Sequence, residues 1–350
     1  MEPRSIIVKA TNWVGDTVLT TPALGTLRKN FPSARITVLA RPWVSPLLEH
    51  HPCVDELWSH DEKQGVGEYL KVVRRIRSRR FDLGISFPNS FSAAFLLWAG
   101  VVKRRIGHQT YHRGAFLSDA IEVSSAILRA HQVHYYLHIL KNLCDVEQTE
   151  ATLFLFVTDE ERASIRERLK QEGIGESDML VLLNPGARYG SAKRWDPERY
   201  AEVADYLTER HGAHVVAIGS KYDSPIVEEV QSAGKHDLIH YAGNTTLREL
   251  MALIERANLL VTNDSGAMHI AAAFNVPLVA IFGSTDWRTT YPFSENAVVV
   301  RKDTACAPCL LRECPEDHEC MKKIEVKDVI EALETLLAKK TSREAVHLRK

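Results

Sequence analysis

Two of the carboxylates that follow short hydrophobic runs are candidates for chemistry. Asp16 comes shortly after the run at residues 5–10, and Asp264 comes directly after the run at residues 258–263. A carboxylate in such a loop can cap the following helix by accepting backbone N–H groups. It can instead act on a bound hydroxyl, as a general base at Asp16 or as a hydrogen-bond acceptor for a sugar at Asp264. The residue types leave both interpretations open.

Residues 184–195 form a second kind of candidate, a cationic loop. It combines Gly186 and Gly190 with Arg188, Lys193 and Arg194. Glycine-rich backbone and cationic side chains suit a bound phosphate. The spacing of a Walker motif is absent, so an ordinary basic surface loop is the alternative.

A run of small residues follows Asp264 and predicts the N-terminus of a helix. Helix N-termini carry unpaired N–H groups and favour phosphate, and Gly266 would let a ligand approach the backbone. His269 lies one turn further on and could equally be a packed histidine. Because the chain has no Asp-x-Asp motif, cations such as Lys193, rather than a divalent metal, would neutralise a departing diphosphate.

Four cysteines near the C-terminus have the spacing C-x2-C-x4-C-x5-C: Cys306, Cys309, Cys314 and Cys320. Four thiolates so close in sequence could bind a structural zinc ion, although the spacing departs from common zinc ribbons. Free, packed thiols are the alternative. No cofactor is required by this interpretation, and a catalytic cysteine is not expected.

The elements that position these residues alternate between strands and helices. Strands are predicted at residues 5–10, 35–40, 82–87, 105–107, 179–184, 214–219, 238–241, 258–263 and 276–282, and helices at 17–31, 68–80, 91–99, 196–210, 225–233, 246–257, 265–274 and 326–338. Buried strands each followed by a helix are typical of parallel sheets covered on both faces. The sequence therefore predicts an α/β protein of two doubly wound, Rossmann-like domains. We expect them at residues 1–165 and 175–320, with residues 321–350 forming a C-terminal helix and a polar tail. Ligands bind beyond the carboxyl ends of such strands, so we expect the two domains to face one another across a cleft.

Charge and hydropathy restrict the partners. The net charge of −1 gives no overall field for binding nucleic acid. Basic runs at residues 71–80 and 103–105 are either solvated surfaces or contacts for phosphorylated lipid headgroups. The N-terminus does not resemble a signal peptide, and no hydrophobic run approaches the length of a membrane span. We expect a cytoplasmic protein, at most peripheral on the inner face of the inner membrane.

The three loops together resemble one family, the ADP-heptose:lipopolysaccharide heptosyltransferases, which have the GT-B fold. The resemblance rests on Asn12-Trp13-Val14-Gly15-Asp16, on residues 20–24 (TTPAL) and on residues 261–266 (VTNDSG) followed by His269, and the first two are most similar to heptosyltransferase II. It extends from Ile6 to about Leu336.

The resemblance implies an inverting transfer of heptose from ADP-heptose to the inner-core heptose of lipopolysaccharide. Asp16 would be the catalytic base, and Asn12, Trp13 and Gly15 would contact the acceptor. The implied donor contacts are Lys193 at the diphosphate, Asp264 at the heptose hydroxyls, the amides of Ser265 and Gly266 at phosphate, and also His269, Arg188 and Ser191. The alternatives are a family member with a different acceptor, a nucleotide-sugar epimerase on the same fold, and a binding protein without turnover.

Overall fold

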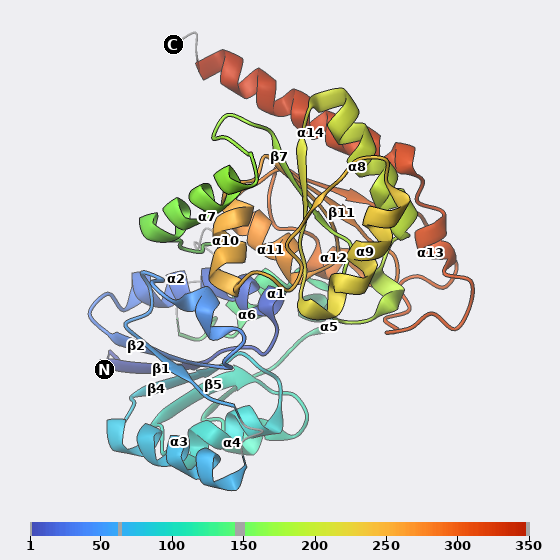
Figure 1. The fold of residues 1–350 in the computed structure, drawn as a ribbon. Helices are drawn as coiled ribbons and strands as arrows, with labels where there is room; N and C mark the ends of the chain where they lie inside the picture. Colours follow the sequence, from blue (N-terminus) through green and yellow to red (C-terminus); the bar gives the residue numbers. More distant parts are fainter. Residues whose placement is uncertain (1, 62–64, 144–150, 348–350) are drawn as a thin grey trace. The chain divides into compact units, whose positions relative to one another are not determined.

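The computed structural model describes residues 2–61, 65–143 and 151–347 and divides the chain into two compact units, Met1–Phe156 and Val157–Lys350. Each unit contains one six-stranded sheet in which every neighbouring pair of strands is parallel (Figure 1). Helices flank both sheets. The predicted fold class, two Rossmann-like α/β domains, is confirmed.

The first sheet has the strand order β3-β2-β1-β4-β5-β6. Its strands are β1 (Ser5–Lys9), β2 (Arg35–Ala40), β3 (Glu56–Ser59), β4 (Leu83–Ser86), β5 (Arg104–His108) and β6 (Asp119–Ile121). The central strands are almost wholly buried because helices cover both of their faces.

Two groups of helices cover this sheet. On one face, α3 (Val66–Arg79) and α4 (Phe91–Ala99) bury Ile76, Leu96 and Leu97 in a common core. On the other face lie α1 (Val14–Leu19), α2 (Thr21–Asn30) and α6 (Gln132–His138), which contact one another (Figure 1). The remaining elements are α5 (Ser125–Arg129) and the 3-10 turns η1 (Ser45–Leu48) and η3 (Arg113–Phe116).

The prediction of a single helix at residues 17–31 is wrong, because the segment belongs to two helices that meet at Thr20. Pro22, in the first turn of α2, has no N–H group to donate to the carbonyl of Val18. The hydroxyl of Thr21 donates to that carbonyl instead, at 2.7 Å. The side chain of Thr20 similarly donates to the carbonyl of Thr17.

The second sheet has the order β12-β11-β10-β7-β8-β9, which is the same topology as the first sheet. Its strands are β7 (Leu180–Asn184), β8 (His214–Ala217), β9 (Ile239–His240), β10 (Leu259–Asn263), β11 (Leu278–Ile281) and β12 (Ala297–Val300). Its helices are α7 (Asp159–Gln171), α8 (Pro197–His211), α9 (Ser224–Ala233), α10 (Leu247–Arg256), α11 (Gly266–Ala273), α12 (Trp287–Thr290), α13 (Glu319–Lys322) and α14 (Val326–His347), with 3-10 turns η4 (Ser191–Lys193) and η5 (Lys221–Asp223).

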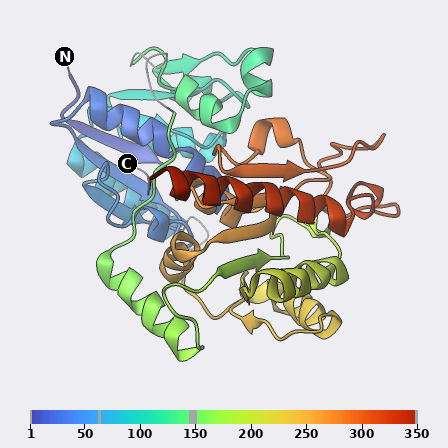
Figure 2. The ribbon, with the colours of Figure 1, turned by 90° about the horizontal axis from the view of Figure 1, so that it is seen from above.

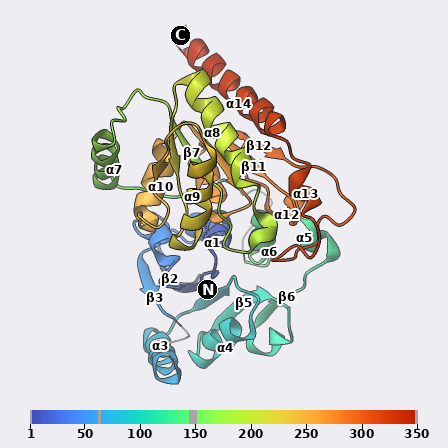
Figure 3. The same ribbon diagram turned by 45° about the vertical axis from the view of Figure 1, so that its right-hand side comes forward.

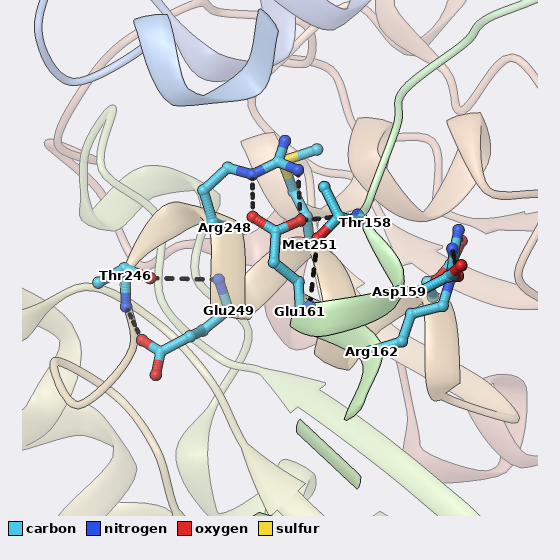
Figure 4. Close-up of polar contacts among 9 residues, drawn as sticks. Thr158, Asp159, Glu161, Arg162, Thr246, Arg248, Glu249 and Met251 are labelled. Atoms are coloured by element: carbon cyan, nitrogen blue, oxygen red, sulfur yellow. Dashed lines mark hydrogen bonds and ion pairs between the residues drawn. The ribbon is translucent and has the colours of Figure 1, made fainter. Parts of the chain in front are cut away.

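Helix α7 is fixed to α10 by ion pairs, and each of the two helices begins with a capping box (Figure 4). The carboxylate of Glu161 accepts from the backbone N–H of Thr158, as a capping box requires, and also from both Nε and Nη2 of Arg248, at 2.7 and 2.5 Å. Arg162 makes a second two-bond pair with Glu255. Figure 2 shows α7 (bright green) beside α10. Helix α7 thereby belongs to the second unit, whereas our expected boundary at residue 165 divides it.

The last helix, α14, packs on the second unit, against β12, β11 and α8 (Figure 3). Val329, Leu333 and Leu336 are buried in the core of that unit. Trp195, itself fully buried, donates from its indole to the carbonyl of Ile324 just before this helix. The helix continues to His347, through residues that we expected to form a polar tail.

Candidate functional site

The predicted site residues lie where the strand order reverses in each sheet. In the first sheet the reversal is between β1 and β4, and in the second it is between β7 and β10. Asn12 and Asp16 follow β1, the cationic loop follows β7, and Asp264 follows β10. Loops that diverge at such a point leave a crevice at the carboxyl ends of the strands, which is where doubly wound sheets bind ligands.

Asp16 is the third residue of α1 and does not occupy the capping position that its sequence context suggested. The residue at that position is Trp13, and no side chain caps the helix there. Asp16 is half-buried and lies close enough to Tyr136 of α6 to affect its titration. Burial raises the pKa of the Tyr136 hydroxyl well above its usual value, and the negative charge of Asp16 raises it further.

The rest of this loop is held by residues that the sequence did not reveal. Arg41 donates to the Oδ1 atom of Asn12 at 3.2 Å, and the indole of Trp43 donates to the Asn12 carbonyl at 2.8 Å. Arg41 also pairs with Asp61 at 2.8 Å. Trp13 remains about half exposed. Residues of the loop that follows β2 therefore hold the backbone just before Asp16 in place.

A buried arginine organises the neighbouring loops after β4 and β5. Arg113 is fully buried and donates to the carbonyls of His108 and Pro88 and to the hydroxyl of Ser86. Burial lowers the pKa of its guanidinium to about 10. Because its donors are used on the protein itself, Arg113 ties the two loops together. The role of Arg113 could not be predicted from the sequence, since a basic residue in a polar segment has no distinguishing pattern.

In the second unit, Lys193 and Asp264 are in direct contact. The ammonium group of Lys193 lies 2.5 Å from Oδ2 of Asp264, and the hydroxyl of Thr285 donates to the same oxygen at 2.7 Å. The two side chains are only 14% and 7% exposed. The ring of Tyr189 lies 4.9 Å from the ammonium group. This arrangement holds one cation, with its counter-ion, at the carboxyl ends of β7 and β10.

Asp264 is not the N-cap residue of α11, so the capping interpretation of Asp264 is wrong. Ser265 occupies the N-cap position and Gly266 is the first helical residue. The side-chain amide of Asn184 donates to the hydroxyls of Thr262 and Ser265, at 3.0 and 2.8 Å. These bonds connect the ends of β7 and β10 below the N-terminus of α11. His269 is buried within the same helix.

The other two residues predicted to contact the donor from the cationic loop, Arg188 and Ser191, are exposed, unlike Lys193 and Asp264. Arg188 is exposed, and its guanidinium stacks over the ring of Tyr222 at 4.0 Å. Ser191 is also exposed, at the start of η4. No described interaction joins either residue to Lys193 or Asp264, and their roles in donor binding stay predictions.

The segment at residues 304–321 holds the cationic loop in place. The backbone N–H of Ala192 donates to the carbonyl of Arg312 at 3.0 Å, and His318 contacts the carbonyl of Ala192 at 2.9 Å. The hydroxyl of Tyr189 donates to the carbonyl of Leu310. A side chain at Gly190 would overlap the Arg312 carbonyl. We call this arrangement the loop clasp.

The four cysteines belong to the clasp segment and are free thiols. Cys320 is buried, and burial, followed by the charges of the three neighbouring thiols, raises its pKa to about 11. Within residues 2–61, 65–143 and 151–347, no group of three or more His, Cys, Asp or Glu side chains is arranged to hold a metal ion.

In the same residues, no helix is long and apolar enough to span a membrane.

Comparison with known proteins adds a family to this geometry. The sequence profile of glycosyltransferase family 9 (heptosyltransferase) matches residues 69–319. The chain is 30% identical to lipopolysaccharide heptosyltransferase 2 of Escherichia coli over 95% of this chain and 98% of the relative. It is 29% identical to lipooligosaccharide heptosyltransferase 2 of Campylobacter jejuni over the same shares. The solved structure of ADP-heptose lps heptosyltransferase II from E. coli superposes with a TM-score of 0.83, at 29% identity, covering 96% of this chain and 99% of that one.

Proposed function

Because the chain belongs to glycosyltransferase family 9, the heptosyltransferases, we propose that it transfers a heptose from ADP-heptose to the inner-core heptose of lipopolysaccharide. The heptosyltransferase 2 relatives, which match nearly the whole chain, support this choice of reaction. The observation that carries it in the structure is the pairing of Lys193 with Asp264 beside the N-terminus of α11.

In the proposed mechanism, the second unit binds the donor. Lys193 and the N–H groups at the start of α11 interact with the diphosphate, whose negative charge increases as the bond from the anomeric carbon to ADP breaks. Asp264 already receives bonds from Lys193 and Thr285 at Oδ2, and its Oδ1 atom would accept from the heptose hydroxyls. No metal ion is needed in this proposal, because the cation is supplied by the chain.

The first unit would bind the acceptor and supply the base. Asp16 takes the proton from the acceptor hydroxyl as that oxygen forms the new bond to the anomeric carbon. Attack occurs opposite to the departing ADP, so the configuration inverts. Asp16 lies in the first turn of α1, just after the carboxyl end of β1, and does not occupy the N-cap position. We further propose that the reaction takes place at the cytoplasmic face of the membrane that carries the acceptor.

The proposal is tested by incubating the protein with ADP-heptose, with and without a mono-heptosylated core acceptor. We expect ADP release only with acceptor, and a product heavier by one heptose in mass spectrometry. Conversion of the donor without acceptor would instead indicate an epimerase. No reaction under either condition, with intact donor binding, would indicate a binding protein.

Asp16→Asn tests the catalytic base. We expect turnover to fall by about two to four orders of magnitude, which is the usual contribution of a general base. ADP binding, measured by calorimetry, should change less than twofold, because the donor contacts lie in the second unit. A variant that loses ADP binding but keeps the wild-type rate at saturating donor would refute the assignment.

A further inference from the structure

Helix α4 carries a row of aromatic side chains on its outer surface. Its inner face buries Ala93, Leu96 and Leu97 against the first sheet, whereas Phe91, Phe95 and Trp98 recur at i, i+4 and i+7 on the other side. Phe91 and Trp98 are 51% and 47% exposed. This helix is hydrophobic on both faces although only one face belongs to the core.

Phe116 of η3 joins these residues, and together we call the four the aromatic patch. The Phe116 ring lies 4.9 Å from Phe91, 5.4 Å from Phe95 and 5.4 Å from Trp98, in edge-to-face contacts. Such packing gives the patch a fixed shape. A contiguous exposed apolar surface of this kind is uncommon on a soluble protein and marks a contact with another apolar phase or partner.

Helix α3, the neighbour of α4, carries exposed arginines. Helix α3 packs against α4, as Figures 1 and 3 show. Arg75 and Arg79 of this helix pair with Glu56, whereas Arg74, Arg77 and Arg80 are exposed and have no acidic partner in the part of the chain that the structure describes. The basic run at residues 71–80 thus contains arginines that are paired with a carboxylate and arginines that are not. In the other basic run, at residues 103–105, Lys103 pairs with Asp82 and Arg104 pairs with Asp119.

We propose that the outer surface of α4 and α3 docks onto an anionic phospholipid bilayer, with the aromatic patch inserted at the level of the headgroups and Arg74, Arg77 and Arg80 on the lipid phosphates. Aromatic rings on one helix face, next to arginines, are the composition of helices that lie in a membrane interface. An anionic surface attracts the unneutralised arginines. A two-fold contact with a second copy would instead place the same basic surface on both sides of the interface.

This inference rests on the proposed function, because an enzyme acting on a lipid-anchored acceptor must work at a bilayer. The patch also begins where the acceptor is expected. Phe91 directly follows Ser90, which caps α4 in the loop after β4, and η3 follows β5 at the same edge of the sheet. Docking through this surface would hold that edge of the first unit near the lipid.

The test is co-sedimentation of the 350-residue chain with vesicles of phosphatidylethanolamine and phosphatidylglycerol, without acceptor. We expect the double variant Phe91→Ser, Trp98→Ser to lower the partition coefficient at least tenfold. The matched control is Leu128→Ser, since Leu128 is 57% exposed on α5, which packs against α6 on the other side of the sheet. This control should bind as the wild type does.

Two further measurements separate the contribution of the arginines from that of the aromatic patch. Arg74→Glu with Arg77→Glu should weaken binding and make it less dependent on salt. Brominated lipids should quench tryptophan fluorescence in the wild type and less in Trp98→Phe. Binding of the Phe91/Trp98 double variant at the wild-type level, or no binding of the wild type, would overturn the proposal. So would a lipid-free dimer that this variant converts to a monomer.

Turnover on a deacylated, soluble acceptor distinguishes failure of docking from failure of the proposed function. We expect the double variant to act on that acceptor at the wild-type rate. Loss of vesicle binding with this activity intact supports the docking proposal. A wild type that binds vesicles but never transfers heptose would refute the function and leave the docking result standing.

Discussion

Lys193 and Asp264 form an ion pair with each other, in addition to the donor-binding roles proposed for them. Each had been predicted as a separate donor ligand, because each stands in a loop after a strand. Their contact could not be predicted, since they are 71 residues apart and meet only because β7 and β10 are neighbours. A largely buried ion pair is costly to break, because the remaining charge is left without a partner.

Lys193→Met and Asp264→Asn test this pair. We expect each single variant to lower the free energy of unfolding by on the order of 3 kcal/mol, because each leaves a largely buried charge without its partner. The double variant should recover much of the loss, as measured by urea denaturation. ADP binding should stay weak in both variants that lack the lysine. Recovered ADP binding in the double variant would remove Lys193 from the donor site.

Gly190→Ala tests the loop clasp. The added methyl group would overlap the carbonyl of Arg312, so either the cationic loop or the segment at residues 304–321 must move. We expect weaker ADP binding and faster reaction of the buried Cys320 with a thiol reagent. Gly25→Ala is the control, since that helical position has open space and should gain about 0.5–1 kcal/mol of stability. Unchanged ADP binding and thiol reactivity in Gly190→Ala would show that the clasp does not position the loop.

At the scale of elements, the sequence pattern identified the central strands and most helices, but it missed the edge strands β3 and β6 of the first sheet and β12 of the second. Strands β3 and β6 were missed because they are short, pair on one side only and carry polar residues such as Glu56 and Asp119. The break between α1 and α2 was missed because the threonines that stabilise it are equally compatible with a continuous helix. The packing of α7 against α10 could not be predicted for a different reason, since the residues that pair with α7 lie about 90 residues further along the chain.

Arg248→Ala tests the attachment of α7. Arg248 is 8% exposed and forms two bonds with Glu161, whose carboxylate also completes a capping box. We expect a loss of about 3 kcal/mol in the unfolding free energy of the second unit. Arg166→Ala is the matched control, because its pair with the exposed Glu176 spans 3.6 Å and such surface pairs contribute about 0–1 kcal/mol. Equal effects of the two variants would contradict a structural role for Arg248.

At the scale of the whole molecule, the division into two compact units predicts unequal responses to acid. Burial lowers the pKa of His51 to about 4 and that of His108 to about 3, and both residues lie in the first unit. An unfolded histidine titrates near 6.5. Stability that these neutral side chains provide is complete above pH 6.5 and is lost as the pH falls toward the folded values, because the unfolded state then binds more protons.

The expected loss approaches about 1.4 kcal/mol per pH unit for each histidine below pH 6.5, which amounts to roughly 3 kcal/mol for both between pH 6.5 and 5. Hydrogen exchange should show β1 losing protection before β7 over this range. His108→Asn cannot take up the proton and should reduce the pH dependence of the first unit by about half. Simultaneous loss of protection in both sheets would contradict independent stability of the units.

The loop clasp also bears on how the protein is made. The cationic loop is synthesised early in the second unit, whereas Arg312, which holds it, is added roughly 120 residues later, on the order of ten seconds at ribosomal rates. Until then a nascent chain can complete β7 and still lack the partners that fix Lys193. Under the proposed function, binding of the donor nucleotide would therefore require translation of the segment at residues 304–321, well beyond the loop itself.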